Sequence, residues 1–115
     1  MPDRYKSHAY TLIEIMIVCG IIGLLAAIAI PSFIMARGSA QKKACIANLR
    51  AIDTAKQIWA TDNRKAATVT PTAANLGPYF GKGTMPTCPG GGTYTIRNVG
   101  TLPSCSLRTS AGHKM

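Results

Sequence analysis

Few residues of this 115-residue chain could do chemistry: four cysteines, two histidines and four carboxylates. The only acidic residues are Asp3, Glu14, Asp53 and Asp62, and no acidic residue follows Asp62. Hydrolysis by paired carboxylates and an oxygen-rich calcium loop are therefore not expected in the C-terminal half. We predict no catalytic residues and no enzyme.

The cysteines and histidines suggest two further chemistries, a zinc site and a cysteine nucleophile. A zinc site would take Cys88, Cys105 and His113, with Cys45 as the fourth ligand. The chain has no Cys-x-x-Cys pair, so the local spacing typical of zinc ligands is missing. A cysteine nucleophile needs a neighbouring base and a group that orients it, and two histidines supply too little. We expect no metal, no cofactor and a solvated His113.

The elements that must position these residues begin with an apolar segment. Residues 15–30 carry no charged or strongly polar side chain, and Glu14 is the single break in the run from Tyr10. Residues 10–36 would form a helix of about 40 Å, which exceeds a hydrocarbon core of about 30 Å. A secretory signal peptide and a plain anchor both leave Glu14 unexplained. A carboxylate at the centre of a spanning helix costs roughly 2.5–3.5 kcal/mol, and less near its end, and it usually has a partner.

Residues 9–18 read Ala-Tyr-Thr-Leu-Ile-Glu-Ile-Met-Ile-Val and, with Pro31 further on, resemble the N-terminus of type IV pilins and pseudopilins. The resemblance implies that a prepilin peptidase removes residues 1–9 as a leader, cuts between Ala9 and Tyr10, and methylates Tyr10. Glu14 matches the family's glutamate, whose negative charge pairs with the positively charged N-terminus of a neighbouring subunit during assembly. Ala9 and Tyr10 stand where the family usually has Gly and Phe.

Gly23 and Pro31 are expected to set the flexibility of this helix. Proline removes one backbone donor, so Pro31 should kink the helix or loosen the turn before it. Filaments of the family often lose helicity between matching Gly and Pro residues, which implies residues 23–31 as the deformable segment. Cys19, Gly23 and Ala27 share one helix face, either as a close-packing stripe or as the small residues common in membrane helices.

Past Pro31 the apolar pattern becomes amphipathic and predicts that the helix continues to about residue 63. Trp59 is predicted to be a core anchor, and Arg50, Lys56, Arg64 and Lys65 are interpreted as a solvated face. The expected buried face comprises Ala44, Cys45, Leu49, Ala51, Ile52, Ala55, Ile58 and Trp59.

The remaining chain predicts a small head with a short helix and two strands. Thr70-Pro71 is typical of a helix start and Gly77-Pro78 of its end, with Tyr79 and Phe80 packing on the long helix. Residues 93–97 and 104–107 read as strands joined by a turn near residues 98–100. We expect an α+β fold class, and the resemblance implies a pilin fold: a long N-terminal helix, membrane-spanning and then amphipathic, that packs on a small antiparallel β-sheet head of residues 37–115.

A head of this size has a marginal core unless it is cross-linked. If the chain is oriented as a pilin, the head faces an oxidising compartment. Cys45, Cys88 and Cys105 then allow three different disulfides. We favour Cys88–Cys105, which would close the predicted hairpin and leave Cys45 as a buried thiol.

The positive net charge of the chain indicates which partners the head could attract. Without residues 1–9, the chain keeps 11 basic and 3 acidic side chains. Such a surface attracts nucleic acid, but no nucleic-acid-binding motif is recognisable. The lack of a C-terminal acidic cluster argues against a calcium-bound head like that of major pseudopilins of type II secretion systems.

The resemblance implies a structural subunit of a type IV pilus or a type II secretion-like pseudopilus, with a competence filament also open. Such a subunit would cross the inner membrane once, with its head outside the cytoplasm, and then enter a periplasmic or extracellular homo-oligomeric filament. Its partners would be prepilin peptidase and an inner-membrane assembly platform. The alternative is a membrane-anchored or secreted monomeric binding module with a basic head.

Overall fold

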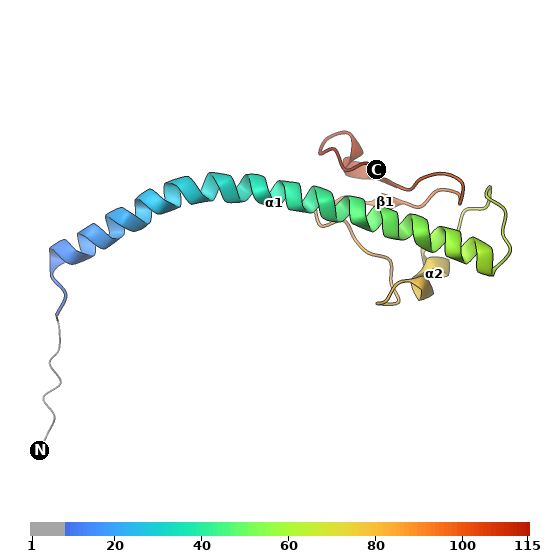
Figure 1. The fold of residues 1–115 in the computed structure, drawn as a ribbon, viewed down its shortest axis with the longest axis horizontal. Helices are drawn as coiled ribbons and strands as arrows, with labels where there is room; N and C mark the ends of the chain where they lie inside the picture. Colours follow the sequence, from blue (N-terminus) through green and yellow to red (C-terminus); the bar gives the residue numbers. More distant parts are fainter. Residues whose placement is uncertain (1–8) are drawn as a thin grey trace, which may run out of the picture. The chain divides into compact units, whose positions relative to one another are not determined.

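The computed structural model describes residues 9–115 and divides the chain into two compact units, Met1–Ala36 and Arg37–Met115. One helix, α1 (Leu12–Asp62), begins in the first unit and ends in the second (Figure 1). The long N-terminal helix predicted over residues 10–63 is confirmed apart from its outermost residues. The predicted leader, residues 1–9, lies outside the described residues except for Ala9.

In the first unit, α1 exposes its apolar side chains. Every large apolar side chain from Tyr10 to Met35 is at least half exposed. This part of α1 is long and apolar enough to cross a membrane. Apolar surface left in water costs about 25 cal/mol per Å², so an exposed area this large indicates a surface that lipid or other protein covers.

Pro31 lies inside α1, and the helix is not interrupted there. Its ring nitrogen has no proton, so one backbone hydrogen bond of the helix is missing at this turn. Residues 23–31 are helical throughout. Loss of helicity between Gly23 and Pro31, which the resemblance implies for assembled filaments, stays a prediction.

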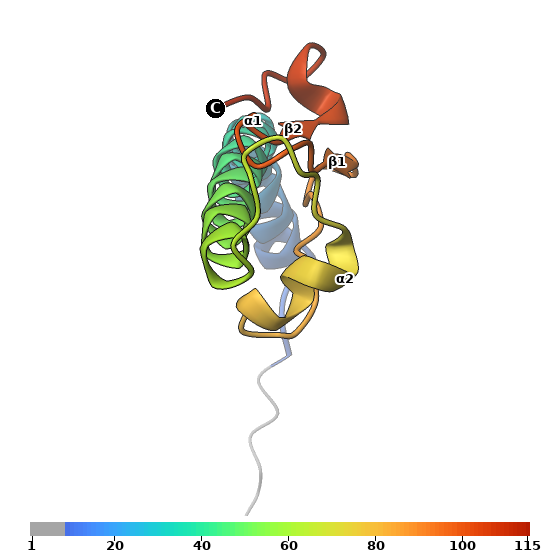
Figure 2. The same cartoon turned by 90° about the vertical axis from the view of Figure 1, so that its right-hand side faces the viewer.

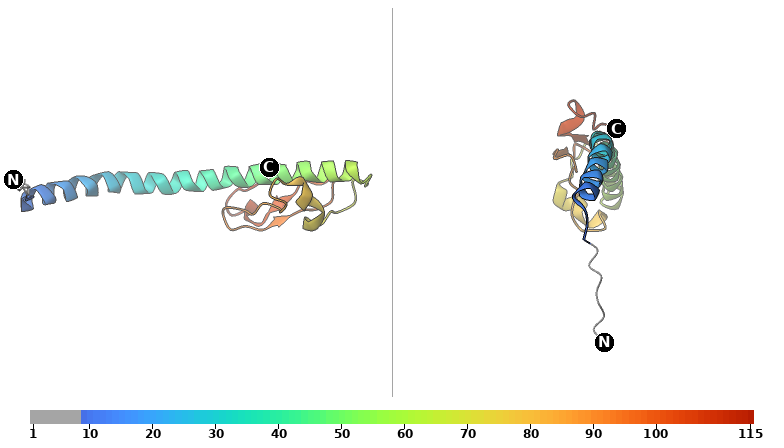
Figure 3. Two further views of the ribbon diagram at one scale, coloured as in Figure 1. Left: turned by 90° about the horizontal axis from the view of Figure 1, so that it is seen from below. Right: turned by 90° about the vertical axis from the view of Figure 1, so that its left-hand side faces the viewer.

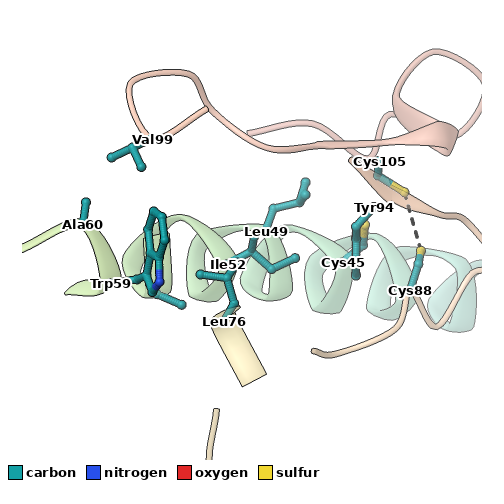
Figure 4. Packing of buried hydrophobic residues seen from close by; sticks show 11 residues of the cluster. Cys45, Leu49, Ile52, Trp59, Ala60, Leu76, Cys88, Tyr94, Val99 and Cys105 are labelled. Atoms are coloured by element: carbon teal, nitrogen blue, oxygen red, sulfur yellow. Dashed lines mark hydrogen bonds between the residues drawn. The ribbon is translucent and has the colours of Figure 1, made fainter. Parts of the chain in front are cut away.

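In the second unit, one face of α1 forms the wall of a small core (Figure 4). Trp59, the predicted anchor, is 8% exposed, and the prediction is confirmed. Figures 2 and 3 show the head segments lying along one side of this part of α1. The core consists of Cys45, Leu49, Ile52, Ala55, Trp59 and Ala60 from α1 and Leu76, Cys88, Tyr94, Val99 and Cys105 from the head.

The buried face of α1 is narrower than predicted. Ala44, Ala51 and Ile58 were expected on it and are exposed. The reason is the small amount of chain available in the head, which covers only a strip of the helix. Lys56 was predicted to lie on a solvated face, and this prediction was wrong. Its side chain is fully buried within the covered strip.

Lys56 is buried because its ammonium group has backbone partners. Its Nζ donates hydrogen bonds to the carbonyl oxygens of Ile96 (3.2 Å), Asn98 (3.0 Å) and Thr101 (2.6 Å). Burial lowers the pKa of Lys56, and the carboxylate of Asp53, 3.6 Å from Nζ, opposes that shift. Lys56 therefore joins the turn before β2 to α1, a role that its position in the helical pattern did not indicate.

The short helix α2 (Ala73–Leu76) begins two residues later than predicted, because Thr72 and not Thr70 is the N-cap. The Thr72 hydroxyl accepts a hydrogen bond from the Asn75 N–H (3.3 Å), and Asn75 Oδ1 accepts one from the Thr72 N–H (3.0 Å). This reciprocal pair is a capping box. Thr70 has Ala73 three residues later, which cannot return such a bond.

A 3₁₀ turn, η1 (Gly77–Tyr79), follows directly after α2, with Gly77 as the C-cap of α2. Tyr79 and Phe80 are partly buried against the core, as predicted. The Tyr79 hydroxyl also donates a hydrogen bond to Asp62 Oδ2 (3.1 Å). This contact joins η1 to the last turn of α1.

Two short strands, β1 (Tyr94–Thr95) and β2 (Ser104–Cys105), form an antiparallel pair with Tyr94 opposite Cys105. The predicted hairpin is confirmed, including its turn, where the Thr101 N–H donates to the Asn98 carbonyl (3.2 Å). The strands are shorter than predicted: β1 lacks residues 93, 96 and 97, and β2 lacks residues 106 and 107. Arg97 has a positive φ of 59°, and a 3₁₀ turn, η2 (Ser106–Arg108), starts immediately after β2.

Candidate functional site

The first candidate site is the start of α1. Glu14 Oε2 accepts a hydrogen bond from the Thr11 N–H (2.8 Å), and Thr11 Oγ1 accepts one from the Glu14 N–H (3.3 Å). These reciprocal bonds form a capping box and satisfy two donors that the first turn leaves unpaired. The Thr-x-x-Glu spacing was visible in the sequence, so this second role of Glu14 and the contribution of Thr11 could have been predicted.

The residues predicted for processing and assembly lie together at this end of the helix. Ala9 and Tyr10 precede α1, and Tyr10 is 80% exposed. One shallow hollow is lined by Tyr10, Glu14, Ile15, Ile17 and Val18. The carboxylate therefore borders an apolar surface, where an opposite charge would be attracted strongly. Gly23 and Pro31 lie further along the same helix.

The second candidate site is a cluster of side chains in the head, here called the thiol–imidazole cluster: Cys45, Cys88, Cys105 and His113. One sulfur or ring-nitrogen atom from each lies within 4.8 Å of all the others, and all four residues are buried. Figure 4 shows Cys45, from α1, close to Cys88 and Cys105, the latter from β2. His113 comes from the C-terminal segment.

The prediction of a solvated His113 was wrong, because its side chain is only 4% exposed. The backbone returns over η2, where the His113 N–H donates to the Leu107 carbonyl (3.3 Å), and places the ring against Cys88. Cys88 and Cys105, the predicted disulfide partners, are brought together as free thiols with their sulfurs 3.7 Å apart. The pairing stays a prediction.

The thiols of the cluster differ in acidity. Burial raises the pKa of Cys45 to about 12. Burial acts on Cys88 in the same direction, but hydrogen bonds from the backbone N–H groups of Gly92 and Gly90, and from His113, outweigh it and lower the pKa of Cys88 to about 6. The head therefore stabilises a thiolate at Cys88 more than at Cys45.

Glycines let the backbone approach the cluster. A Cβ added at Gly92 would lie 2.6 Å from Cys105 Sγ, and one at Gly90 would lie 2.9 Å from His113 Cε1. Real Cβ atoms do not come this close to other heavy atoms, so both positions require residues without a side chain. The Gly-Gly-Gly run after Cys88-Pro89 is the sequence signal for this close approach.

Comparison with known proteins supports the assignment of the N-terminal segment. Residues 4–30 match the family described as the prokaryotic N-terminal methylation motif. Type II secretion system core protein G of Escherichia coli (strain K12) is 29% identical over 108 residues, which cover 83% of this chain and 74% of that protein. Type IV major pilin protein PilA of Myxococcus xanthus (strain DK1622) is 46% identical over 52 residues, 45% of this chain and 24% of that protein.

No solved structure matches the chain at a comparable level of similarity. The motif covers the residues on which the sequence resemblance depended, and the Escherichia coli protein extends the similarity across most of the chain. The long apolar helix and the small antiparallel sheet agree with a pilin fold. The N-terminal segment of this chain thus carries the prokaryotic N-terminal methylation motif, and the chain is similar to a type II secretion system core protein and to a type IV major pilin.

Proposed function

We propose that this protein is a structural filament subunit of a type IV pilus or a type II secretion-like pseudopilus, polymerised through the first part of α1. The observation that carries the proposal is the exposed apolar surface between Tyr10 and Met35, whose first turn contains an acidic residue within a methylation motif. Lipid covers such a surface before assembly, and the same surface of other copies covers it afterwards. The two named relatives, a secretion-system core protein and a major pilin, support this function.

Processing would occur between Ala9 and Tyr10. Both residues are exposed and precede the first helical turn, so a peptidase could bind this bond in an extended conformation. Intact mass and N-terminal sequencing of the protein from its native host test the step. We expect a chain that starts at methylated Tyr10. A start after Ala29 would mean an ordinary secreted domain, and an uncleaved chain would mean a plain anchor; either result would overturn the proposal.

Glu14 would carry assembly through its charge. Its bond from the Thr11 N–H uses Oε2, and an ionised carboxylate can accept further hydrogen bonds. Cleavage before Tyr10 creates an ammonium group at the N-terminus of every subunit. A carboxylate and an ammonium group in an apolar environment are each costly alone and tolerable as a hydrogen-bonded pair, so the pair favours docking of one subunit on the next.

The capping box provides a sharp test of this role. Glu14→Ala removes both the charge and the cap, whereas Glu14→Gln removes the charge and keeps an oxygen that can cap. Thr11→Val removes the hydroxyl side of the box and keeps the charge. We expect filaments to be lost with both Glu14 variants and kept with Thr11→Val, scored by filament purification. Normal filaments from Glu14→Gln would show that the charge is not required.

The methylation motif and the apolar helix indicate membrane anchoring before assembly. The proposal adds a single pass through the inner membrane with the head outside the cytoplasm, followed by a periplasmic or extracellular filament. Prepilin peptidase and an inner-membrane assembly platform would be the partners in these steps. Protease accessibility of the head in spheroplasts, compared with intact cells, tests the orientation.

A monomeric binding module with a basic head is the competing function. One observation favours an anionic ligand: Arg97, Arg108 and Lys114 line the same hollow of the head. Nucleic acid is the ligand that this charge would attract, although no recognition motif supports it. Such a module would stay monomeric in detergent, and its affinity for DNA would fall steeply with added salt. The filament subunit is expected to form filaments with or without DNA.

A further inference from the structure

The geometry points to a zinc site in the head, where the thiol–imidazole cluster holds one Zn²⁺ in a closed tetrahedral centre. The ligands would be the sulfurs of Cys45, Cys88 and Cys105 and Nδ1 of His113. All four belong to the second unit, Arg37–Met115. The inference therefore does not depend on whether the chain assembles into a filament.

Two of the distances within the cluster match those of a zinc centre, and the remaining ones are at most 4.8 Å. Zinc–sulfur bonds of about 2.3 Å and zinc–nitrogen bonds of about 2.0–2.1 Å place two tetrahedral sulfurs about 3.8 Å apart and a sulfur and a nitrogen about 3.6 Å apart. The Cys88 and Cys105 sulfurs are 3.7 Å apart. The Cys88 sulfur is 3.6 Å from His113 Nδ1. The ligand atoms could thus bind the metal with little movement.

The donor set selects a soft or borderline metal and excludes a hard one. Thiolates and imidazole bind zinc well, whereas calcium and magnesium require oxygen ligands. Among the described residues, both acidic side chains of the head are engaged elsewhere: Asp53 lies 3.6 Å from Lys56 Nζ, and Asp62 accepts a bond from Tyr79. Four protein ligands leave no open position, so the site is structural and not catalytic.

Zinc also accounts for more of the cluster than a disulfide does. A Cys88–Cys105 disulfide uses two of the four groups and leaves the Cys45 thiol and the His113 ring buried beside it. A zinc ion uses all four. The backbone of the glycine-rich loop packs against the same group of side chains, since a Cβ added at Gly90 would lie 3.7 Å from the Cys88 sulfur.

Binding would join four separate parts of a small domain. The ligands lie on α1, before the glycine-rich loop, at the end of β2 and in the C-terminal segment, so one ion cross-links all of them. The three cysteines would bind Zn²⁺ as thiolates and the histidine as neutral imidazole. The resulting charge of −1 is compensated by a head that holds 11 of the 13 Lys and Arg side chains.

The first test measures metal in the full-length chain, extracted in detergent without chelator or reductant. We expect about one zinc per chain by elemental analysis, and four free thiols when the protein is denatured with a chelator. After reduction and removal of the metal, addition of Co²⁺ alone should produce the visible absorption of a tetrahedral thiolate site. Two free thiols with no zinc would indicate the disulfide and overturn the inference.

Matched variants locate the site. His113→Ala and Cys45→Ser should each lower zinc affinity by more than the roughly 10–100-fold typical of changes around a metal centre, although neither residue belongs to the predicted disulfide. Cys19→Ser is the control, because Cys19 is exposed and lies in the other unit. Retention of full zinc content by His113→Ala would overturn the inference, as would equal loss in Cys19→Ser. If the variants fail to fold, cobalt absorption of the wild-type chain still decides.

Discussion

The two units of this chain present their candidate functional residues in different ways. In the first unit, Ala9, Tyr10 and Glu14 are neighbours in sequence and lie on an exposed surface. In the second, Cys45, Cys88, Cys105 and His113 come from four separate segments and are buried. The first unit therefore offers a surface for other molecules, and the second offers an internal site that only its own fold can build.

The two units are also stabilised by different interactions. Backbone hydrogen bonds and a capping box hold the first unit as a helix, and burial of its apolar surface must come from lipid or other subunits. The second unit has a core of its own, although it is small and rests on strands of two residues each. We expect core substitutions to act on the second unit alone.

The largest effect is expected from a matched pair of leucines. Leu49 is fully buried in the head, and Leu24 is 71% exposed in the first unit. Leu49→Ala should lower the free energy of unfolding of the head by about 2–5 kcal/mol, whereas Leu24→Ala should change it by less than about 0.5 kcal/mol. Urea unfolding in detergent, followed by fluorescence of the single Trp59, measures both. A similar loss in the two variants would show that the units are energetically coupled.

Pro31 tests whether the first unit has a local weak point. Pro31→Ala restores a backbone donor, and proline inside a helix is about 3 kcal/mol less favourable than alanine. Amide exchange around residues 27–31 in micelles should slow by roughly 100-fold, since 1.4 kcal/mol corresponds to a factor of ten. Gly23→Ala, which has open space around its Cβ, should give a smaller change in the same direction. Unchanged exchange would remove residues 23–31 as the deformable segment.

Most of the fold was predictable because its signals are local. A continuous apolar run, an amphipathic continuation and alternating residues around a turn predicted the long helix and the hairpin, and Trp59 was correctly placed in the core. Both capping boxes could also have been predicted, because Thr72 and Asn75, like Thr11 and Glu14, are three residues apart in the sequence. They were missed because another interpretation of Thr70 and of Glu14 was preferred.

The thiol–imidazole cluster could not be predicted in the same way. Its residues are separated by at least eight positions, so no local spacing predicts that they meet, and a histidine near a chain end is usually exposed. The burial of Lys56 has the same cause. Its partners are carbonyl groups of residues 96–101, more than one third of the chain away. Every residue has a backbone carbonyl, so the sequence does not indicate which carbonyls will accept a hydrogen bond from a distant lysine.

Gly92 tests how tightly the glycine-rich loop is fitted to the cluster. In Gly92→Ala, the new Cβ would meet Cys105 Sγ at 2.6 Å, so either the loop or the sulfur must move. We expect a loss of about 1–3 kcal/mol in the free energy of unfolding and weaker cobalt absorption. Gly81→Ala is the control, because nothing lies within 4 Å of its Cβ and such a change is neutral or slightly stabilising. Equal behaviour of the two variants would mean that the loop does not pack on the cluster.

Lys56 is expected to contribute less than Leu49, and the pH dependence of its effect identifies the cause. Lys56→Met removes the donor of three backbone carbonyls and should cost about 1–3 kcal/mol, whereas Lys65→Met at an exposed position should cost less than about 0.5 kcal/mol.

Burial lowers the pKa of Lys56 in the folded chain below its ordinary value of 10.5. At pH values between the lowered pKa of the folded chain and 10.5, the unfolded chain therefore binds this proton more tightly than the folded chain does. Lys56 therefore makes the free energy of unfolding rise with pH in that window. The gap between wild type and Lys56→Met should then be larger near pH 10 than near pH 8. A gap that narrows as the pH rises would mean that the three carbonyls and Asp53 stabilise the ammonium group more than burial penalises it, and the pKa of Lys56 would then lie above its ordinary value.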